Sequence, residues 1–406
     1  MLCQFTVKNY QCLKDEVTFD MQAAAISEHD ESLIVDKDGE KFLPLGVIYG
    51  PNGSGKSTVL DALCSFICKI MRPICAVGCS NQECIKNSRN VTIKPFRFSK
   101  DSLNKPTEFE LFFRTKANEY QYIISILKDK VLREKLYKKS ITGSRYSLLF
   151  KREPGSDIEL KGPFRGYNCS GISDNLPLLS YLGITHRRNV IIKDIVNWLE
   201  TDIDFVNYGN PGEDAHIPVA KSGELKTLVL QMLMEMDIDI RDYRTEEEKD
   251  ELKVYTSHVV DDRNYELELW EESKGTIKIF GILPNIADCL LHGTALIVDE
   301  LDAKLHPLLL KYIINLFSNP EINKKGAQLI FTSHDLSTMN SDTFRRDEIW
   351  FIAKGENNAS KLYSLIEFKS EDGRTERKDA RYDKRYLEGR YGADPYFRRI
   401  IDWGEY

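Results

Sequence analysis

A short stretch of the chain, Gly50 to Thr58, reads GPNGSGKST and contains the pattern G-x-x-x-x-G-K-[ST]. The apolar run Leu45 to Tyr49 precedes it, and Val59 to Cys64, which reads as the first turns of a helix, follows it. This feature constrains the fold most, because such a loop is held between the end of a buried strand and the start of a helix. The sequence therefore predicts an α/β fold organised around a phosphate-binding loop.

The residue types in this loop suit a nucleoside triphosphate. Glycines let backbone N–H groups converge on phosphates at the positive end of the helix that follows. Lys56 supplies positive charge for the β- and γ-phosphates, and the Ser57 hydroxyl is a ligand for Mg²⁺. The predicted nucleotide-binding residues are Gly50, Pro51, Asn52, Gly53, Ser54, Gly55, Lys56, Ser57 and Thr58.

Two later apolar runs also end in polar side chains. The run 294–298 is followed by Asp299 and Glu300, and the run 328–332 is followed by a serine and His334. Parallel strands deliver their carboxyl ends to one edge of a sheet, where the phosphate loop also lies. We predict that Asp299 belongs to the Mg²⁺ shell, that Glu300 takes a proton from the attacking water, and that His334 reaches the γ-phosphate.

The rest of the chain is divided by its patterns. Its 406 residues, 42% of them hydrophobic, suffice for two to three lobes. We predict a nucleotide-binding core with a mostly parallel sheet from residues 1–90 and 271–360, and an antiparallel β subdomain over 91–155. A helical lobe over 156–270 and a C-terminal lid or docking segment over 361–406 complete the division, although a solvated terminal helix pair fits that last segment as well.

Local patterns add further predictions. Alternation within 5–10 and 17–20 predicts a strand pair with one buried face, and Val91 to Ile93 also reads as a strand. The charge-dense stretch 244–251 predicts a solvated helix end or loop. Five cysteines fall between Cys64 and Cys84, but their spacing favours packing on a helix over a zinc site, and no metal is predicted there.

Composition limits the class of protein. No apolar run approaches about 18 residues and no signal-peptide core is visible, so we expect a soluble, cytoplasmic protein with no membrane partner. The net charge of −7 argues against coating of nucleic acid by an overall field. The segment 128–152 is nevertheless rich in lysine and arginine, with Tyr137 and Tyr146 among them. This basic hairpin suits either contact with DNA phosphates or the solvated face of an edge strand.

The order of these motifs resembles the ABC-type ATPase head of SMC, RecF and OLD-like proteins. Ser273-Lys274-Gly275-Thr276 looks like a reduced ABC signature that lacks the full L-S-G-G-Q, and the stretch 300–307 (ELDAKLHP) matches the extension of bacterial AAA proteins of this group. The resemblance implies ATP and Mg²⁺ as cofactors. It also implies a homodimer or higher homo-oligomer that sandwiches two nucleotides, with Ser273 and Gly275 completing the partner's site and Asp302 in the D-loop position.

Within that group the chain is similar to stand-alone bacterial ATPases of restriction-linked and anti-phage loci. The segments 95–98 (PFRF) and 385–395 (RYLEGRYGADP) carry this narrower resemblance. It implies an ATPase sensor and scaffold that controls an effector protein, such as a nuclease or toxin. A RecF-like or SMC-like DNA-binding ATPase in DNA maintenance remains open, as does a nucleotide-gated binding module with little turnover.

Overall fold

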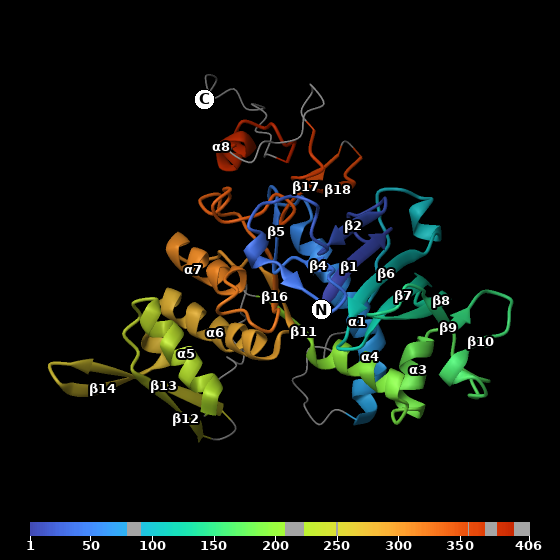
Figure 1. Ribbon diagram of the computed structural model, residues 1–406, viewed down its shortest axis with the longest axis horizontal. Helices are drawn as coiled ribbons and strands as arrows, with labels where there is room; N and C mark the ends of the chain where they lie inside the picture. Colours follow the sequence, from blue (N-terminus) through green and yellow to red (C-terminus); the bar gives the residue numbers. More distant parts are fainter. Residues whose placement is uncertain (79–90, 208–222, 249–250, 356, 370–379, 394–406) are drawn as a thin grey trace, which may run out of the picture.

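The structure is a computed structural model, and it describes the chain except residues 79–90, 208–222, 249–250, 356, 370–379 and 394–406. A six-stranded sheet lies at its centre (Figure 1), with the order β11-β15-β16-β5-β17-β18. All neighbouring pairs in it are parallel except β17 and β18. Its strands are β11 (Ile203–Asn207), β15 (Ala295–Asp299), β16 (Gln328–Thr332), β5 (Leu45–Tyr49), β17 (Ile349–Lys354) and β18 (Ser360–Ser364). The predicted mostly parallel sheet is confirmed.

Each central strand of this sheet is apolar along its length because both faces are covered. Side chains alternate between the faces, so Val47 packs in one hydrophobic core and Ile48 in the other. In β15, Ile297 and Val298 divide between the two cores in the same way. This alternation explains why the sequence shows continuous apolar runs at β5, β15 and β16 rather than a period of two.

A seven-stranded antiparallel sheet covers one side of the molecule, in the order β10-β9-β8-β7-β6-β1-β2. Its strands are β1 (Leu2–Lys8), β2 (Val17–Asp20), β6 (Thr107–Arg114), β7 (Asn118–Leu127), β8 (Lys130–Ser140), β9 (Ser147–Arg152) and β10 (Glu159–Leu160). The strand pair predicted near the N-terminus is confirmed, but it joins this sheet through β6 and not the parallel one. The strand predicted at Val91 to Ile93 is wrong, since that segment has no ladder partner.

Helix α1 (Lys56–Gly78) lies between the two large sheets. Its Phe66 ring centroid is 5.4 Å from that of Phe109 on β6 and 5.7 Å from that of Tyr122 on β7. Cys64 and Cys68 are buried on this helix with their sulfur atoms 3.9 Å apart, as expected for small apolar side chains, whereas Cys79 and Cys84 lie outside the described residues. The packing of α1 therefore connects the phosphate loop to the antiparallel sheet.

The remaining helices pack on the parallel sheet or on the helices next to it. They are α3 (Leu178–Thr185), α4 (Val190–Thr201), α5 (Gly223–Glu235), α6 (Lys274–His292), α7 (Pro307–Ser318) and α8 (Tyr382–Leu387), with short 3₁₀ turns η1 (Asp30–Ser32), η2 (Ser102–Asn104), η3 (Gly162–Phe164) and η4 (Leu269–Glu271). A small ribbon, β3 (Ile34–Val35) with β4 (Lys41–Phe42), completes the N-terminal region. In the described part of the chain, no helix combines the length and apolar character needed to span a bilayer.

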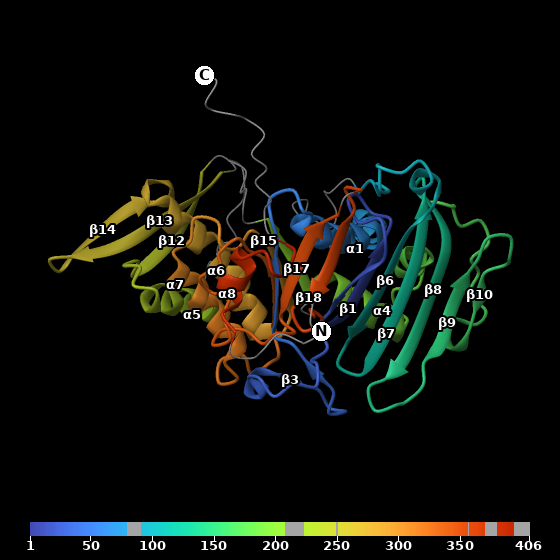
Figure 2. The ribbon, with the colours of Figure 1, turned by 90° about the horizontal axis from the view of Figure 1, so that it is seen from above.

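The segment expected to be mainly helical contains α3, α4 and α5, but its end is different. A three-stranded antiparallel sheet is formed by β12 (Asp242–Glu248), β13 (Glu251–Val260) and β14 (Arg263–Glu268). The prediction of a helix end or loop over 244–251 is therefore wrong. Only one face of this sheet is buried, because Tyr243 packs edge-on against Phe280 of α6 while Asp242, Arg244 and Glu246 of β12 are exposed. Figure 2 shows this sheet at the opposite end of the molecule from β8–β10.

The C-terminal segment is attached to the core over its described part. The rings of Tyr386 and Tyr391 stack on Phe351 of β17, at centroid distances of 5.7 and 4.9 Å. The hydroxyl of Tyr386 donates to the carbonyl of Ala393 at 2.8 Å. Residues 380–393 thus bury their aromatic side chains against the sheet, which a solvated helix pair would not do, and the lid role of the segment 361–406 stays a prediction. Docking of a partner on their outer surface stays a prediction.

Candidate functional site

The phosphate loop runs from the end of β5 to the first turn of α1. Gly53 and Gly55 have φ angles of 74° and 109°, which favour glycine. The loop also lies close to its neighbours: a Cβ on Gly50 would lie 2.5 Å from the carbonyl oxygen of Ile352, and one on Gly55 would lie 2.5 Å from the sulfur of Cys12. Gly53 and Gly55 are thus required by their φ angles, and Gly50 and Gly55 are required because a side chain would not fit.

Two polar side chains of this loop are buried. Ser54 is 1% exposed and its hydroxyl oxygen has no hydrogen-bond partner in the described structure. Lys56 is 7% exposed, and its ammonium group donates to the carbonyl oxygens of Gly50 at 2.7 Å and Pro51 at 3.3 Å. A buried hydroxyl without a partner costs about 1–3 kcal/mol unless a ligand satisfies it. The loop thus fits a bound polyanion such as a triphosphate.

The two carboxylates predicted as catalytic follow β15 and are held by the neighbouring strand. The buried hydroxyl of Thr332, at the end of β16, donates to a carboxylate oxygen of Asp299 at 2.6 Å. The same hydroxyl oxygen accepts the backbone N–H of Glu300 at 2.7 Å. Glu300 has a φ of 54°, in the left-handed region that few non-glycine residues occupy. One threonine therefore fixes both the Asp299 carboxylate and the unusual backbone of Glu300.

Asp302 and His334 lie together after the same two strands. One carboxylate oxygen of Asp302 accepts the backbone N–H of His334 at 3.0 Å. Its other oxygen is buried and has no partner among the described residues. The structure thus places Asp302 beside the His334 backbone of its own subunit, which gives it a local role besides the D-loop contact implied by the resemblance.

The charges of this cluster act on one another. Burial lowers the pKa of Lys56 to about 8, and the nearby carboxylates of Asp302, Glu300 and Asp299 oppose that shift. Partial burial, with the charge of Lys56 in addition, lowers the pKa of His334 and so favours its neutral imidazole. Three carboxylates against one lysine leave an excess of negative charge at this edge. Among the described residues, however, no three His, Cys, Asp or Glu side chains are grouped so that they could hold a metal ion.

A fourth strand end at this edge was missed in the sequence. β11 pairs in parallel with β15, and its last residue, Asn207, is in register with Asp299. The strand lies inside the segment read as helical, because its five residues carry too short a period-two pattern to stand out between helices. The sequence did contain one indication of this strand, because the segment 203–207 (IDFVN) resembles the other strands that end in a polar residue.

Ser273 and Gly275 lie elsewhere, at the N-terminus of α6. The Ser273 hydroxyl caps the helix by accepting the backbone N–H of Thr276 at 3.1 Å. At Gly275 a Cβ would have no neighbour closer than 3.8 Å, where the carbonyl oxygen of Lys304 lies. From the same helix, the Lys278 ammonium group donates to the carbonyl oxygen of Ala303 at 3.2 Å. Gly275 and Lys278 thus lie next to the backbone of residues 303–304, which follow Asp302.

Comparison with known proteins defines the family. A family model described as "AAA domain, putative AbiEii toxin, Type IV TA system" matches residues 45–340. The chain belongs to this AAA family. None of the curated proteins compared with it matches.

Solved structures similar to this AAA protein are SMC heads. The SMC head domain from Thermotoga maritima shares 14% identity at a TM-score of 0.39, with 89% of this chain and 98% of that chain covered. An SMC head bound to the C-terminal winged-helix domain of ScpA shares 13% at a TM-score of 0.44, with 89% and 97% covered. An Smc head with an extended coiled coil, bound to the C-terminal domain of ScpA derived from Pyrococcus furiosus, shares 13% at 0.39, with 89% and 96% covered.

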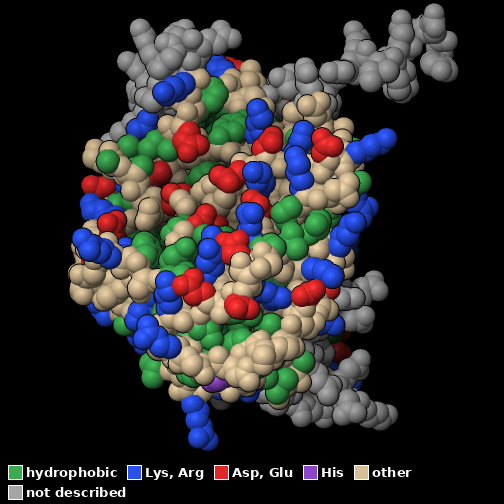
Figure 3. All heavy atoms as spheres, turned by 90° about the vertical axis from the view of Figure 1, so that its right-hand side faces the viewer, with side chains coloured by type: hydrophobic (Ala, Val, Ile, Leu, Met, Phe, Trp, Pro, Cys, Tyr) green, Lys and Arg blue, Asp and Glu red, His purple; other side chains and the backbone are tan. Residues whose placement is uncertain are grey.

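The basic segment 128–152 of this AAA protein forms the hairpin β8–β9, and some of its basic side chains pair with acidic ones. Lys135 and Lys151 both lie within 3.5 Å of Glu153, and Lys139 lies 3.1 Å from Glu119. Figure 3 shows this side of the molecule with acidic side chains dispersed among the basic ones. The hairpin therefore has the mixed charge typical of a solvated edge rather than a continuous basic strip.

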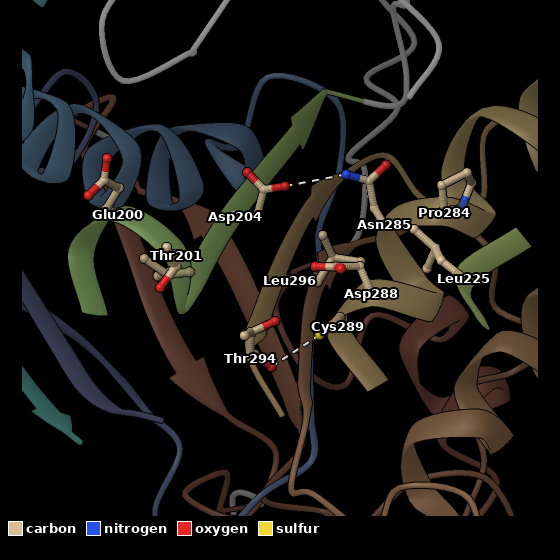
Figure 4. A pocket seen from close by; sticks show the side chains of 11 residues that line it. Glu200, Thr201, Asp204, Leu225, Pro284, Asn285, Asp288, Cys289, Thr294 and Leu296 are labelled. Atoms are coloured by element: carbon tan, nitrogen blue, oxygen red, sulfur yellow. Dashed lines mark hydrogen bonds between the residues drawn. The ribbon is translucent and has the colours of Figure 1, made fainter. Parts of the chain in front are cut away.

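A separate cavity of about 440 Å³ lies between β11 and α6 (Figure 4). Asn285 of α6 donates to the carboxylate of Asp204 on β11 at 3.3 Å, and the thiol of Cys289 donates to the carbonyl of Thr294 at 3.1 Å. The lining contains no lysine, arginine or histidine and none of the phosphate-loop residues. The cavity is therefore acidic and distinct from the candidate nucleotide site.

Proposed function

We propose that this AAA-family protein binds ATP with Mg²⁺ and hydrolyses it. The observation that supports this most is the bridging hydroxyl of Thr332, which joins Asp299 and Glu300 at the sheet edge where the phosphate loop also ends. A purely structural aspartate–glutamate pair has no need of a left-handed residue held by a buried hydroxyl. The buried hydroxyl of Ser54, without a partner in the described structure, adds a second reason.

In this proposal each residue has one task. Lys56 and the backbone of 50–58 hold the phosphates, and Ser57 with Asp299 would hold Mg²⁺, which supplies charge neutralisation and orientation when bound. Glu300 accepts the proton of the attacking water, and neutral His334 donates a hydrogen bond to the γ-phosphate.

The proposal extends to assembly. Two subunits would sandwich two nucleotides, with Ser273 and Gly275 of one contacting the nucleotide held by the other. The N-terminus of α6 supports this, because Ser273 and Lys274 are exposed, Gly275 is half-buried with open space above it, and the exposed Lys304 lies beside it. ATP would then join the subunits and hydrolysis would separate them.

For the biological role we propose control of a partner effector in bacterial anti-phage defence. The resemblance of the segments 95–98 and 385–395 supports it, and the family description, which names a putative toxin of a toxin–antitoxin system, is compatible with it. The ion pairs of the 128–152 hairpin weigh against DNA binding as the main task. Co-purification of the protein with a neighbouring gene product would test the effector part.

The first experiment measures the mass in solution of the Glu300→Gln variant, with and without ATP and Mg²⁺, beside the wild-type protein. We expect the variant to accumulate as an ATP-dependent dimer or larger assembly, while the wild type turns ATP over. An unchanged mass, together with absence of turnover in the wild type, would contradict the proposal. The protein would then be a nucleotide-gated binding module.

A further inference from the structure

An exposed tryptophan stands beside the N-terminus of α6. Trp270 is 57% exposed, whereas Trp198 is 1% and Trp350 is 4% exposed. The fourth tryptophan, Trp403, lies outside the described residues. An indole offers a large apolar area, so leaving it in water is unfavourable unless another surface covers it.

The backbone that carries Trp270 is fixed on both sides. Before it, Glu268 and Glu271 cap the turn η4 reciprocally, each side chain accepting a backbone N–H of the other residue. After it, the carboxylate of Glu272 lies 2.6 Å from the hydroxyl of Thr256 and 2.7 Å from Nε2 of His258, both on β13. The sheet β12–β14 thus fixes the segment that presents the indole, and side chains presented in this way bind strongly because little entropy is given up on association.

The position of Trp270 suggests what covers it. It precedes Ser273 by three residues, so the two Cα atoms are at most about 11 Å apart. A partner that buries roughly 800 Å² per side covers a patch of about 16 Å radius. A second subunit seated on Ser273 and Gly275 would therefore extend over Trp270, since Ser273 and Trp270 are both exposed.

We propose that Trp270 is an interface residue between two copies of this chain, covered when ATP joins them. This inference rests on the proposed ATP-dependent assembly and names the side chain that anchors it. A second copy is the favoured occupant because Lys274 and Lys304, both exposed beside Gly275, complement the anionic nucleotide that the other subunit would present. The indole would thus be covered by the second copy, and the two lysines would lie near the nucleotide that this copy holds.

Tryptophan emission of the Glu300→Gln protein, recorded with and without ATP and Mg²⁺, tests this directly. We expect the emission to shift to shorter wavelength on assembly as Trp270 leaves water, and the shift to disappear in a Glu300→Gln, Trp270→Phe variant. Trp270→Ala in the same background is expected to weaken the dimer at least tenfold in sedimentation measurements. Val190→Ala, at an 80% exposed site on α4, is the matched control and should not weaken it.

The outcomes separate this inference from the proposed function. If the Glu300→Gln protein assembles with ATP but neither its emission nor the Trp270→Ala dimer changes, the role of Trp270 is refuted and the assembly stands. If the protein binds ATP and stays monomeric, both ideas fail. Circular dichroism and the melting temperature of Trp270→Ala show whether a weak dimer reflects the missing indole or an unfolded subunit, and Trp270→Phe provides a milder variant if the alanine variant unfolds.

Discussion

The candidate ATP site has two parts, the phosphate loop with its sheet edge and the N-terminus of α6. These two halves differ in how far their side chains are buried and held by the rest of the subunit. Around the phosphate loop, Ser54, Lys56 and Thr332 are buried, and strands β5, β15 and β16 hold the proposed catalytic groups together. At the N-terminus of α6, Ser273 is exposed, and the neighbouring Trp270 is the only exposed tryptophan among the described residues. The first half is preorganised by one sheet edge, whereas the second leaves polar and apolar groups exposed, where the proposed second subunit would cover them.

The largest difference in ATP affinity is expected between substitutions of two lysines, Lys56 and Lys274. Lys56→Ala should weaken ATP binding by the monomer about 10- to 100-fold, because it removes a buried charge that contacts phosphates. Lys274→Ala should leave that affinity within about twofold and weaken only ATP-dependent assembly. Titration with a fluorescent ATP analogue under dilute, monomeric conditions measures both. Equal losses of affinity in the two variants would remove the distinction between the halves.

Thr332→Val tests the buried bridge of the first half. The substitution leaves the N–H of Glu300 without an acceptor and Asp299 without a donor, so it should lower the free energy of unfolding by about 1–3 kcal/mol. ATP turnover should fall as well. The surface substitution Thr201→Val should stay within about 0.5 kcal/mol in the same urea titration. A fully stable and active Thr332→Val protein would show that the bridge is dispensable.

Raising the pH should weaken nucleotide binding through Lys56. Its pKa is lowered to about 8 by burial, so the free protein loses this charge as the pH rises through 8. Because a triphosphate favours the charged form, its dissociation constant should rise up to about tenfold per pH unit above 8. Isothermal titration across this pH range measures the trend. Lys56→Arg, which stays charged throughout, should give a flat profile even if its affinity is lower.

The smallest effect is expected on the antiparallel sheet, far from either half. Lys138→Ala combined with Lys139→Ala should leave ATP turnover unchanged, and duplex DNA should show no steep salt-dependent binding to either protein, since nearby carboxylates pair with many of the basic side chains. Binding across a salt series provides the measurement. A slope that falls by about 0.9 for each phosphate no longer neutralised would instead favour the DNA-binding alternative.

Sequence patterns located the strands and the loop of the first half because these signals are local. The phosphate loop needs glycines and a lysine at fixed spacing, and Asp299 and His334 follow strands whose apolar runs are visible without a structure. The strand β11 was missed because its pattern is short. The sheet β12–β14 was missed because its charged outer face, with Arg244 between Glu246 and Glu266, reads as solvated helix or loop when only composition is considered.

The sequence by itself determined the parallel sheet and the loop at its edge, since continuous apolar runs and glycine spacing are visible within short stretches of the chain. Only the tertiary structure decided that Thr332 bridges Asp299 and Glu300, and that β13 fixes Glu272 beside Trp270. These hydrogen bonds join residues distant in sequence, and their strength depends on burial and geometry. Neither property can be read from residue types before the strands are brought together.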